Sequence, residues 1–176
     1  MTDVMIRAAT PADIPALHAL VESAYRGEAS RAGWTTEADL LGGQRTDPEE
    51  LAEIIADPAQ AILSAWRENA LVGCVQIADR GQGVGYFGLL SVSPTLQAAG
   101  LGRRLVDAAE AELAHRFGAV RVRLTAFPQR RTLRAWYERL GYRDTGRTLP
   151  FDYGNPRLGL PLCDGLHFIV MEKEIA

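Results

Sequence analysis

The sequence has little cysteine and little histidine, which limits the disulfide and metal chemistry available to it. Its 176 residues contain two cysteines, Cys74 in an apolar segment and Cys163 in a segment rich in proline and glycine. Two thiols in such dissimilar settings form neither a disulfide framework nor a four-ligand metal site. The three histidines, at positions 18, 115 and 167, show no paired spacing. We therefore predict no metal site.

Long apolar runs are also lacking. No stretch reaches the roughly 20 apolar residues that a membrane-spanning helix requires. Residues 1–4 lack the basic and apolar succession of a secretion signal. We expect a soluble, cytoplasmic protein without a membrane partner.

Lysine is almost absent, because Lys173 is the only one in the chain. Arginines gather between Arg116 and Arg147, as they would on a surface that binds nucleic acid. The net charge is −3, however, and arginine is the ordinary cation throughout this sequence. We interpret the arginines as a solvated face and expect no nucleic-acid partner.

Length and patterning indicate one domain over residues 1–176, since 47% hydrophobic content suffices for a single core. Apolar residues recur every four positions over residues 101–117, which predicts an amphipathic helix. A helix that joins two strands makes those strands parallel. Residues 34–43 fit either a short helix or a loop. Strands are expected at residues 4–8, 61–66, 71–78, 84–92, 120–125, 142–147 and 167–174, with helices at about 11–25, 48–57, 101–117 and 131–140.

The most informative segment lies between the strand at 84–92 and the helix at 101–117, and reads Gln97-Ala98-Ala99-Gly100-Leu101-Gly102. A strand followed by a helix start leaves backbone N–H groups free at the positive end of the helix dipole. Glycine at 100 and 102 would let an anion approach the backbone closely. The alternative is an ordinary strand-to-helix turn. No Lys-Ser or Lys-Thr follows the last glycine, which disfavours a nucleotide triphosphate loop.

A second segment supports a specific resemblance. Residues 132–142 read Thr-Leu-Arg-Ala-Trp-Tyr-Glu-Arg-Leu-Gly-Tyr. The glycine loop followed by this helix resembles the two motifs of the GCN5-related N-acetyltransferase (GNAT) superfamily, which binds acyl-CoA. Many members carry an asparagine shortly before the tyrosine of the second motif. This chain has Gln129, Arg130 and Arg131 there instead.

The resemblance implies a mixed α/β fold, with a mostly antiparallel sheet, a splayed pair of parallel strands and helices on both faces. It implies that acetyl-CoA pairs with the strand edge at 90–92 and rests its pyrophosphate on the following loop. Arg104, Arg130 and Arg131 are further candidates for contact with phosphate. The residues predicted to bind the cofactor are Leu90, Ser91, Val92, Gln97, Ala98, Ala99, Gly100, Leu101, Gly102 and Arg103.

The resemblance also implies an N-acetyltransferase that moves an acetyl group from acetyl-CoA to a primary amine of a small molecule. Tyr137 stands at the family's tyrosine and is the predicted general acid, the alternative being a core residue. Peptide or protein amines are an alternative acceptor, and a non-catalytic acyl-CoA-binding module is an alternative function. Candidates for the base are Glu22, Glu37, Asp152 and His167, or a water held by several of them. A homodimer is left open.

The acceptor is expected to lie against the irregular N-terminal region. Glu37 would meet an ammonium, Arg26 a carboxylate and Trp34 a flat or cationic face, beside Tyr25. Asp152 is added to this acceptor set. The alternative is that Tyr25 and Trp34 fasten the helix to the sheet while Arg26 and Glu37 are solvated.

Overall fold

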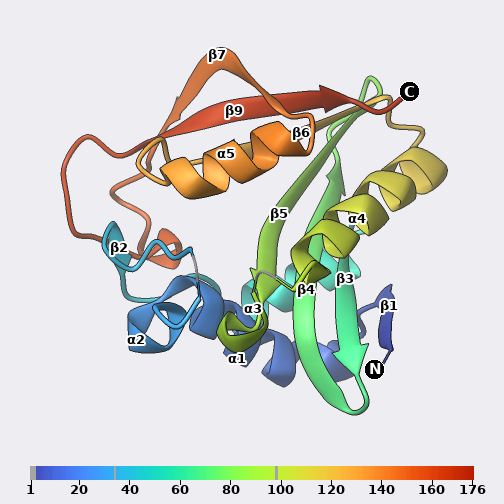
Figure 1. Cartoon of the computed structure of the whole chain (residues 1–176), viewed down its shortest axis with the longest axis horizontal. Helices are drawn as coiled ribbons and strands as arrows, with labels where there is room; N and C mark the ends of the chain where they lie inside the picture. Colours follow the sequence, from blue (N-terminus) through green and yellow to red (C-terminus); the bar gives the residue numbers. More distant parts are fainter. Residues whose placement is uncertain (1–2, 34, 98) are drawn as a thin grey trace.

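A seven-stranded sheet runs through the whole molecule, with helices on both of its faces (Figure 1). The structure, a computed structural model, describes residues 3–33, 35–97 and 99–176. Neighbouring strands follow the order β1-β3-β4-β5-β6-β9-β7, and among these described strands only β5 and β6 pair in parallel. The strands are β1 (Val4–Ala8), β3 (Gln60–Arg67), β4 (Ala70–Asp79), β5 (Val84–Val92), β6 (Arg121–Ala126), β7 (Arg143–Pro150) and β9 (His167–Glu174).

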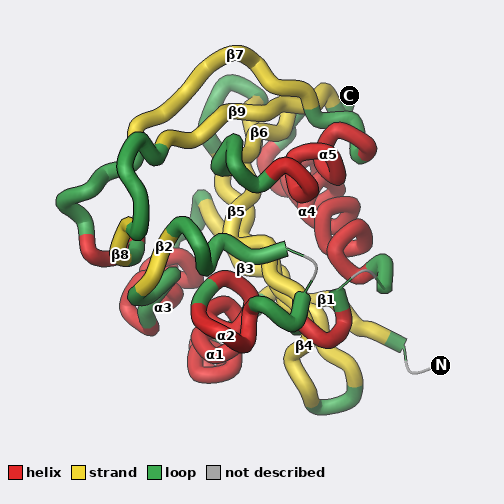
Figure 2. The backbone as a smooth tube through the Cα atoms, turned by 60° about the vertical axis from the view of Figure 1, so that its left-hand side comes forward, coloured by secondary structure: helices red, strands yellow, loops and turns green. Residues whose placement is uncertain are grey.

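Two pairs of helices cover the sheet. On one face, α4 (Leu101–Phe117) and α5 (Arg131–Arg139) pack in one core cluster with Phe87 and Tyr142. On the other face, α1 (Ile14–Tyr25) and α3 (Pro48–Ala56) pack against Ile62 and Leu89. The predicted four-residue stripe of α4 is buried at Leu105, Ala109 and Leu113. Figure 2 shows α4 and α5 together on one side and α1 with α3 on the other.

Short elements complete the chain. A four-residue helix, α2 (Gly27–Ser30), follows α1, and one-turn 3₁₀ helices occur at Pro11–Asp13, Pro94–Leu96 and Pro156–Leu158. Two two-residue strands, β2 (Leu41–Gly42) and β8 (Leu160–Pro161), pair in a separate antiparallel ribbon. In the described part of the chain, no helix is both long enough and apolar enough to cross a membrane.

The centre of the sheet opens between β5 and β6. These strands pair only at Val84–Tyr86 with Arg121–Arg123, although β5 continues to Val92 and β6 to Ala126. A β-bulge lies in the same part of β5, where Val75 of β4 faces both Leu89 and Leu90. Leu89 has a φ of 51°, a left-handed value that is uncommon for a branched side chain. Bulges bend a strand and turn its side chains, so β5 leans away from β6.

Most predicted elements are confirmed, and β5, α4 and β9 have the predicted bounds. The sheet is mostly antiparallel with one splayed parallel pair, as the resemblance implied. Two predictions are wrong in part. β7 continues to Pro150 rather than ending near Arg147, because it pairs with β9 on both sides of an irregular stretch. Residues 41–42 form a strand rather than a helix or loop, since β8 supplies a partner from far along the chain.

Candidate active site

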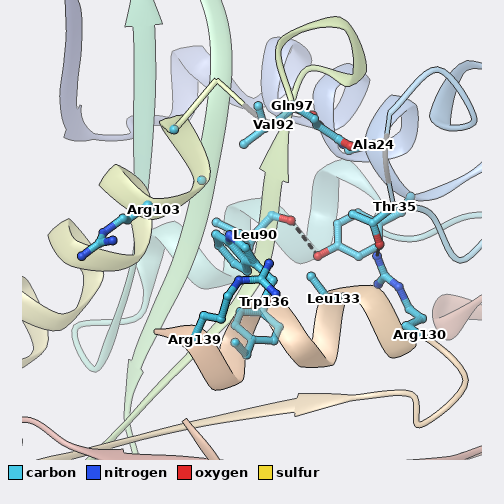
Figure 3. A pocket seen from close by; sticks show the side chains of 14 residues that line it. Ala24, Thr35, Leu90, Val92, Gln97, Arg103, Arg130, Leu133, Trp136 and Arg139 are labelled. Carbon is cyan, nitrogen blue, oxygen red and sulfur yellow. Dashed lines mark hydrogen bonds between the residues drawn. The ribbon is translucent and has the colours of Figure 1, made fainter. Parts of the chain in front are cut away.

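Two adjoining cavities occupy the opening beside β5. The larger one, of about 400 Å³, lies between the start of α4, the end of β5 and one side of α5 (Figure 3). The smaller one, of about 100 Å³, lies between the separated ends of β5 and β6. The two cavities share five lining residues: Tyr25, Leu90, Arg130, Leu133 and Tyr137.

The start of α4 forms one end of the large cavity. Its N-cap is Gly100, with a φ of 84°, and no side chain caps the helix. The first turn holds no acidic residue and carries Arg103 instead, which lines the cavity together with Gly100 and Gly102. Free N–H groups, the helix dipole and a guanidinium all favour an anion at this point.

The two glycines serve different purposes. Gly100 needs its positive φ, and a Cβ there would meet no atom of the described residues within 4 Å. Gly102, in contrast, is an ordinary residue of α4 without a positive φ. A Cβ on Gly102 would lie 3.4 Å from the ring of Trp136, which lines the same cavity. Gly102 therefore leaves space between α4 and α5.

The β5 edge forms the floor of the large cavity. Leu90 and Val92 line it, whereas the side chain of Ser91 turns away and donates to the carbonyl of Leu89. Tyr25 fixes this edge, since its hydroxyl donates to the Leu90 carbonyl at 2.8 Å (Figure 3). Burial raises the pKa of Tyr25 to about 12, so the phenol remains a donor at neutral pH.

Tyr137 lies at the junction of the two cavities. Its ring packs against Phe87, Trp136 and Tyr142, with centroid separations of 5.9, 5.1 and 6.1 Å. Its hydroxyl has no hydrogen-bond partner among the described residues. Burial raises the pKa of this phenol well above its usual range. Tyr137 thus keeps its proton at neutral pH and presents it where the cavities meet.

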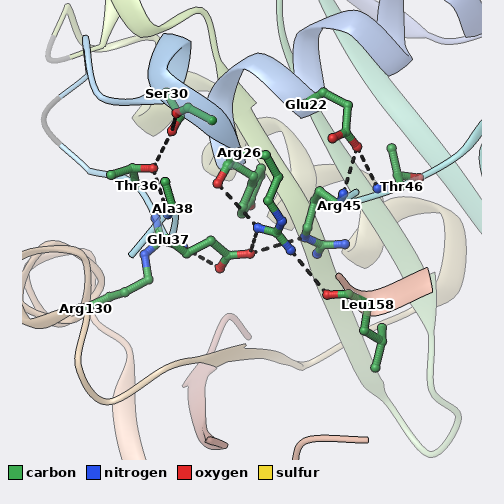
Figure 4. Close-up of polar contacts among 12 residues, drawn as sticks. Glu22, Arg26, Ser30, Thr36, Glu37, Ala38, Arg45, Thr46, Arg130 and Leu158 are labelled. Carbon is green, nitrogen blue, oxygen red and sulfur yellow. Dashed lines mark hydrogen bonds and ion pairs between the residues drawn. The ribbon is translucent and has the colours of Figure 1, made fainter. Parts of the chain in front are cut away.

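Arginines surround a single carboxylate beside the small cavity (Figure 4). Glu37 is 5% exposed and accepts from Nη1 of Arg26 and, at 3.2 Å, from Nη1 of Arg130. Arg45 approaches the same carboxylate at 3.8 Å. Arg26 is also 5% exposed. The interpretation that Arg26 and Glu37 are solvated is therefore wrong, because each neutralises the other inside the protein.

The predicted cofactor residues fall into three groups. Leu90, Val92, Gln97, Gly100, Gly102 and Arg103 line the large cavity. The side chains of Ser91 and Leu101 are buried in the core, and exposed Ala99 does not line the cavity. These three residues could therefore contact a cofactor only through their backbones. Ala98 lies outside the described residues. Gln97 donates its side-chain amide to the Val92 carbonyl at 3.3 Å.

The other predicted residues are more scattered. Of the proposed phosphate contacts outside the loop, Arg104 donates to the carbonyl of Val4, and Arg130 is held by Glu37. Tyr25, Arg26 and Glu37 line the small cavity, while Asp152 is exposed and closes a turn at the amide of Gly154. Trp34 lies outside the described residues. The acceptor role of this set stays a prediction.

Among the candidate bases, only Glu37 lines a cavity. Glu22 accepts from the backbone amides of Arg45 and Thr46. His167 contacts the carbonyl of Gly165. No group of three potential metal ligands is found within residues 3–33, 35–97 and 99–176.

Sequence reasoning missed several lining residues. Leu133 and Arg139 line the large cavity from α5. Leu133 lies one turn before Tyr137 and Arg139 lies three residues after Trp136, and these helical spacings could have identified both. Arg45 could not have been found this way, because it lies in an irregular segment between β2 and α3. The aromatic residues Phe127, Phe151 and Phe168 come from three distant segments and meet only in the fold.

Comparison with known proteins gives a consistent result for the fold. Ribosomal-protein-S18-alanine N-acetyltransferase from Escherichia coli has a TM-score of 0.71 at 16% identity, covering 99% of this chain and 95% of that one. The structure of yncA from Salmonella typhimurium, with its cofactor acetyl-CoA, has a TM-score of 0.69 at 19% identity, covering 98% and 94%. A spermidine N-acetyltransferase chimera from Vibrio cholerae and hSSAT has a TM-score of 0.67 at 17% identity, covering 97% and 94%.

No curated protein matches the sequence significantly. A family model does match, described as the Acetyltransferase (GNAT) family, over residues 18–142. This range contains the glycine loop, the β5 edge and Tyr137, and the fold likeness extends over nearly the whole chain. The chain belongs to the GNAT family of acetyltransferases.

Proposed function

We propose that the protein transfers an acetyl group from acetyl-CoA to the primary amine of a small molecule, with both substrates bound at once and Tyr137 as general acid. The observation that carries this proposal is the position of Tyr137 in the lining of both cavities. The large cavity extends from Tyr137 to the start of α4, where an anion is favoured, and the small cavity extends from Tyr137 to Glu37 and its arginines. A donor and an acceptor would meet beside the same hydroxyl.

The large cavity fits acetyl-CoA by its chemistry. Gly100 leaves an open, uncapped helix start for a pyrophosphate, and Arg103 and Arg139 add positive charge along the lining. The β5 edge at Leu90 and Val92 offers backbone groups for an extended amide chain, in the manner of an added strand. Acetyl-CoA supplies an acetyl group activated as a thioester.

The transfer has two proton requirements. A bond forms between the amine nitrogen and the acetyl carbon while the carbon–sulfur bond breaks, so the amine loses a proton and the sulfur gains one. Tyr137 holds a proton that no described partner engages, and buried packing fixes the ring that carries it. Glu37 already accepts from Arg26 and Arg130, so we assign the removal of the amine proton to water at the small cavity.

The test is a steady-state assay of CoA release with purified protein, acetyl-CoA and a panel of small primary amines. The proposal predicts amine-dependent release well above hydrolysis without amine, together with acetyl-CoA binding by calorimetry. Acetyl-CoA binding without turnover on small amines or on peptides would instead favour a binding module. Turnover confined to peptides would favour a protein acceptor.

A further inference from the structure

Glu37 is already paired with two guanidinium groups. Its two oxygens accept from Arg26 and Arg130, which come from the end of α1 and the start of α5. Arg45 stands at 3.8 Å from the same carboxylate. Glu37 is the only acid among the described residues that line either cavity. The small cavity therefore has one negative charge facing three guanidinium groups.

Arg26 is engaged through both of its terminal nitrogens. Besides Glu37, its Nη1 donates to the carbonyl of Tyr25 and its Nη2 to the carbonyl of Leu158, both at 3.3 Å. A Cβ on Gly159 would lie 3.1 Å from that Nη2, so the backbone closes over it. Arg26 thus holds Glu37 and the 156–159 turn together. It is a positioning residue rather than one that reads a ligand.

Arg45 is different from the other two arginines. Its guanidinium stacks over the Tyr25 ring at 5.0 Å and lines the small cavity. Within the described part of the chain, its side chain makes no hydrogen bond, only the long contact with Glu37. The side chain is 24% exposed. Its N–H donors are therefore positioned by stacking and remain open toward the cavity.

The backbone beneath Arg45 is firmly held. Glu22 of α1 accepts from the amides of Arg45 and Thr46 at 2.8 and 2.9 Å (Figure 4). Thr46 is fully buried and donates to Glu50 of α3 at 2.6 Å. These nearby acids are thus engaged with other groups. The fold fixes an arginine at the cavity wall and leaves it to share the carboxylate of Glu37 with two other arginines.

We infer that Arg45 binds a carboxylate of the acceptor, so that the preferred acceptor is a small amino acid. This inference rests on the proposed function and names its substrate class. A carboxylate matches the planar, two-pronged donor array of a guanidinium. It would also reduce the excess of positive charge in the small cavity, where Arg130 provides a second guanidinium.

The remaining walls define the rest of the acceptor. Phe127 and Phe168 stack at 4.6 Å between centroids and, with Phe151, give the small cavity an apolar side. A volume of about 100 Å³ corresponds to roughly three water molecules. Such a space suits a compact apolar side chain, with the amine directed to Tyr137 at the shared end. A polyamine would bring several positive charges to a site that already has an excess of them.

The first experiment compares matched acceptors with the native enzyme. The probes are L-alanine, L-leucine, L-methionine and L-phenylalanine, the primary amide of each, and spermidine. The amide also represents the N-terminal residue of a peptide, because the carboxyl group of that residue is likewise part of an amide bond. We expect kcat/KM for the best acid to exceed that of its amide by at least about tenfold. Loss of the carboxylate lowers the pKa of the amine, which by itself would favour the amide.

The second experiment removes the guanidinium. Arg45→Gln should lower kcat/KM for the best acid by about tenfold or more and change kcat/KM for the corresponding amide by less than about threefold. Arg45→Lys should lower kcat/KM for the acid by less than Arg45→Gln does. The control is Arg116→Gln, since Arg116 also stacks on an aromatic ring at 5.0 Å, on Phe117 outside both cavities. It should leave both substrates unchanged.

Calorimetry separates this inference from the proposed function. The same acids and amides are titrated into each variant in the presence of CoA, which measures binding without turnover. Tighter binding of acids that depends on Arg45 supports the inference even if no CoA is released. Equal kcat/KM for acid and amide in the native enzyme, or equal losses for both in Arg45→Gln, would overturn it and leave an acetyltransferase of other specificity.

Discussion

Four buried or partly buried tyrosines lie around the site, and their hydroxyl groups distinguish their roles. Tyr25 donates to the Leu90 carbonyl and Tyr142 to Glu110, at 2.8 and 2.7 Å. Arg80 stacks on the ring of Tyr86 at 4.6 Å. Of the four, only Tyr137 combines a buried side chain and a place in both cavities with a hydroxyl that has no partner among the described residues. A purely structural tyrosine would be expected to satisfy its hydroxyl.

The raised pKa of Tyr137 predicts the pH dependence of turnover. Burial disfavours the phenolate, so the protonated form persists beyond the usual phenol pKa of about 10. We expect kcat/KM to rise with pH as the acceptor amine loses its proton and then to level off, with no fall below about pH 10. The measurement is kcat/KM between pH 6 and 10.5 with one good acceptor. A fall in kcat/KM near pH 9 that disappears in Tyr137→Phe would contradict a raised pKa of Tyr137.

The sequence allowed some of these residues to be predicted but not their partners. Tyr137 follows from a motif whose residues are contiguous. The pairing of Arg26 with Glu37 could not be predicted, because a loop and a short helix bring the two together. Arg45 has no local signature at all. Its place depends on Glu22 of α1, more than twenty residues earlier in the chain, which accepts hydrogen bonds from the amides of residues 45 and 46.

The two ends of helix α4 have similar backbone conformations but lie at opposite ends of the helix dipole. Gly100 precedes the helix with φ 84°, and Gly118 follows it with φ 68°. In the part of the chain that the structure describes, a Cβ at either glycine would meet no atom within 4 Å. Substitution at either position therefore costs similar backbone strain. Only the first position lies at the positive end of the helix dipole and in the large cavity.

Gly100→Glu should abolish the binding of CoA. The new carboxylate would occupy the place of the pyrophosphate and repel it, so we expect affinity to fall by about 100-fold or more. The control is Gly118→Glu, which should bind CoA like the native protein. Calorimetry with CoA measures both, after circular dichroism establishes that each variant is folded. Unchanged affinity in folded Gly100→Glu would remove this loop from the binding site.

The N-terminus of α3 provides a test of stability. Asp47 caps the helix by accepting from the amide of Glu50 at 2.7 Å, and it also accepts from Nε of Arg157 at 3.0 Å. The Arg157 guanidinium, followed by the Glu50 amide, lowers the pKa of Asp47 to about 2. Its stabilising effect is therefore complete above the unfolded-state pKa of about 4 and is lost as the pH falls toward 2.

Asp47→Ala should lower the free energy of unfolding by about 1–2 kcal/mol at pH 7, mostly through the lost cap, because the Arg157 side chain is 39% exposed and solvent screens its pairing with Asp47. The difference from the native protein should shrink at pH 3. Urea unfolding at both pH values measures it. Glu49→Ala, an exposed residue of the same helix turn, should cost less than about 0.5 kcal/mol. An equal cost for Asp47→Ala at both pH values would show that its charge is irrelevant.

Elements with strong local signals could be predicted from the sequence. Residues 84–92 and 101–117 have clear periodicity and glycine boundaries, and the structure has the same bounds. The bulge at Leu89 could not be predicted, since leucine gives no sign of a left-handed backbone. The β2 and β8 pair was also missed. Each strand has two residues and exists only because the other lies beside it.

For the molecule as a whole, the opening between β5 and β6 determines where the site lies. Pairing stops after Tyr86 and Arg123, and both cavities lie along β5 beyond that point. The splayed pair was predicted from the resemblance to the GNAT family rather than from periodicity. The small cavity, with its arginines and phenylalanines, could not be predicted, because it gathers the end of α1, the segment between β2 and α3, the start of α5 and the long segment after β7.

The central claim is that acetyl transfer takes place beside the Tyr137 hydroxyl, and Tyr137→Phe tests it most directly. The substitution removes one oxygen and preserves the ring that packs on Phe87 and Trp136. We expect kcat for the best acceptor to fall by about 10²–10⁴-fold, with acetyl-CoA affinity by calorimetry within about threefold of native. Turnover within a factor of about two of the native enzyme would contradict the account and leave Tyr137 as a residue of the core.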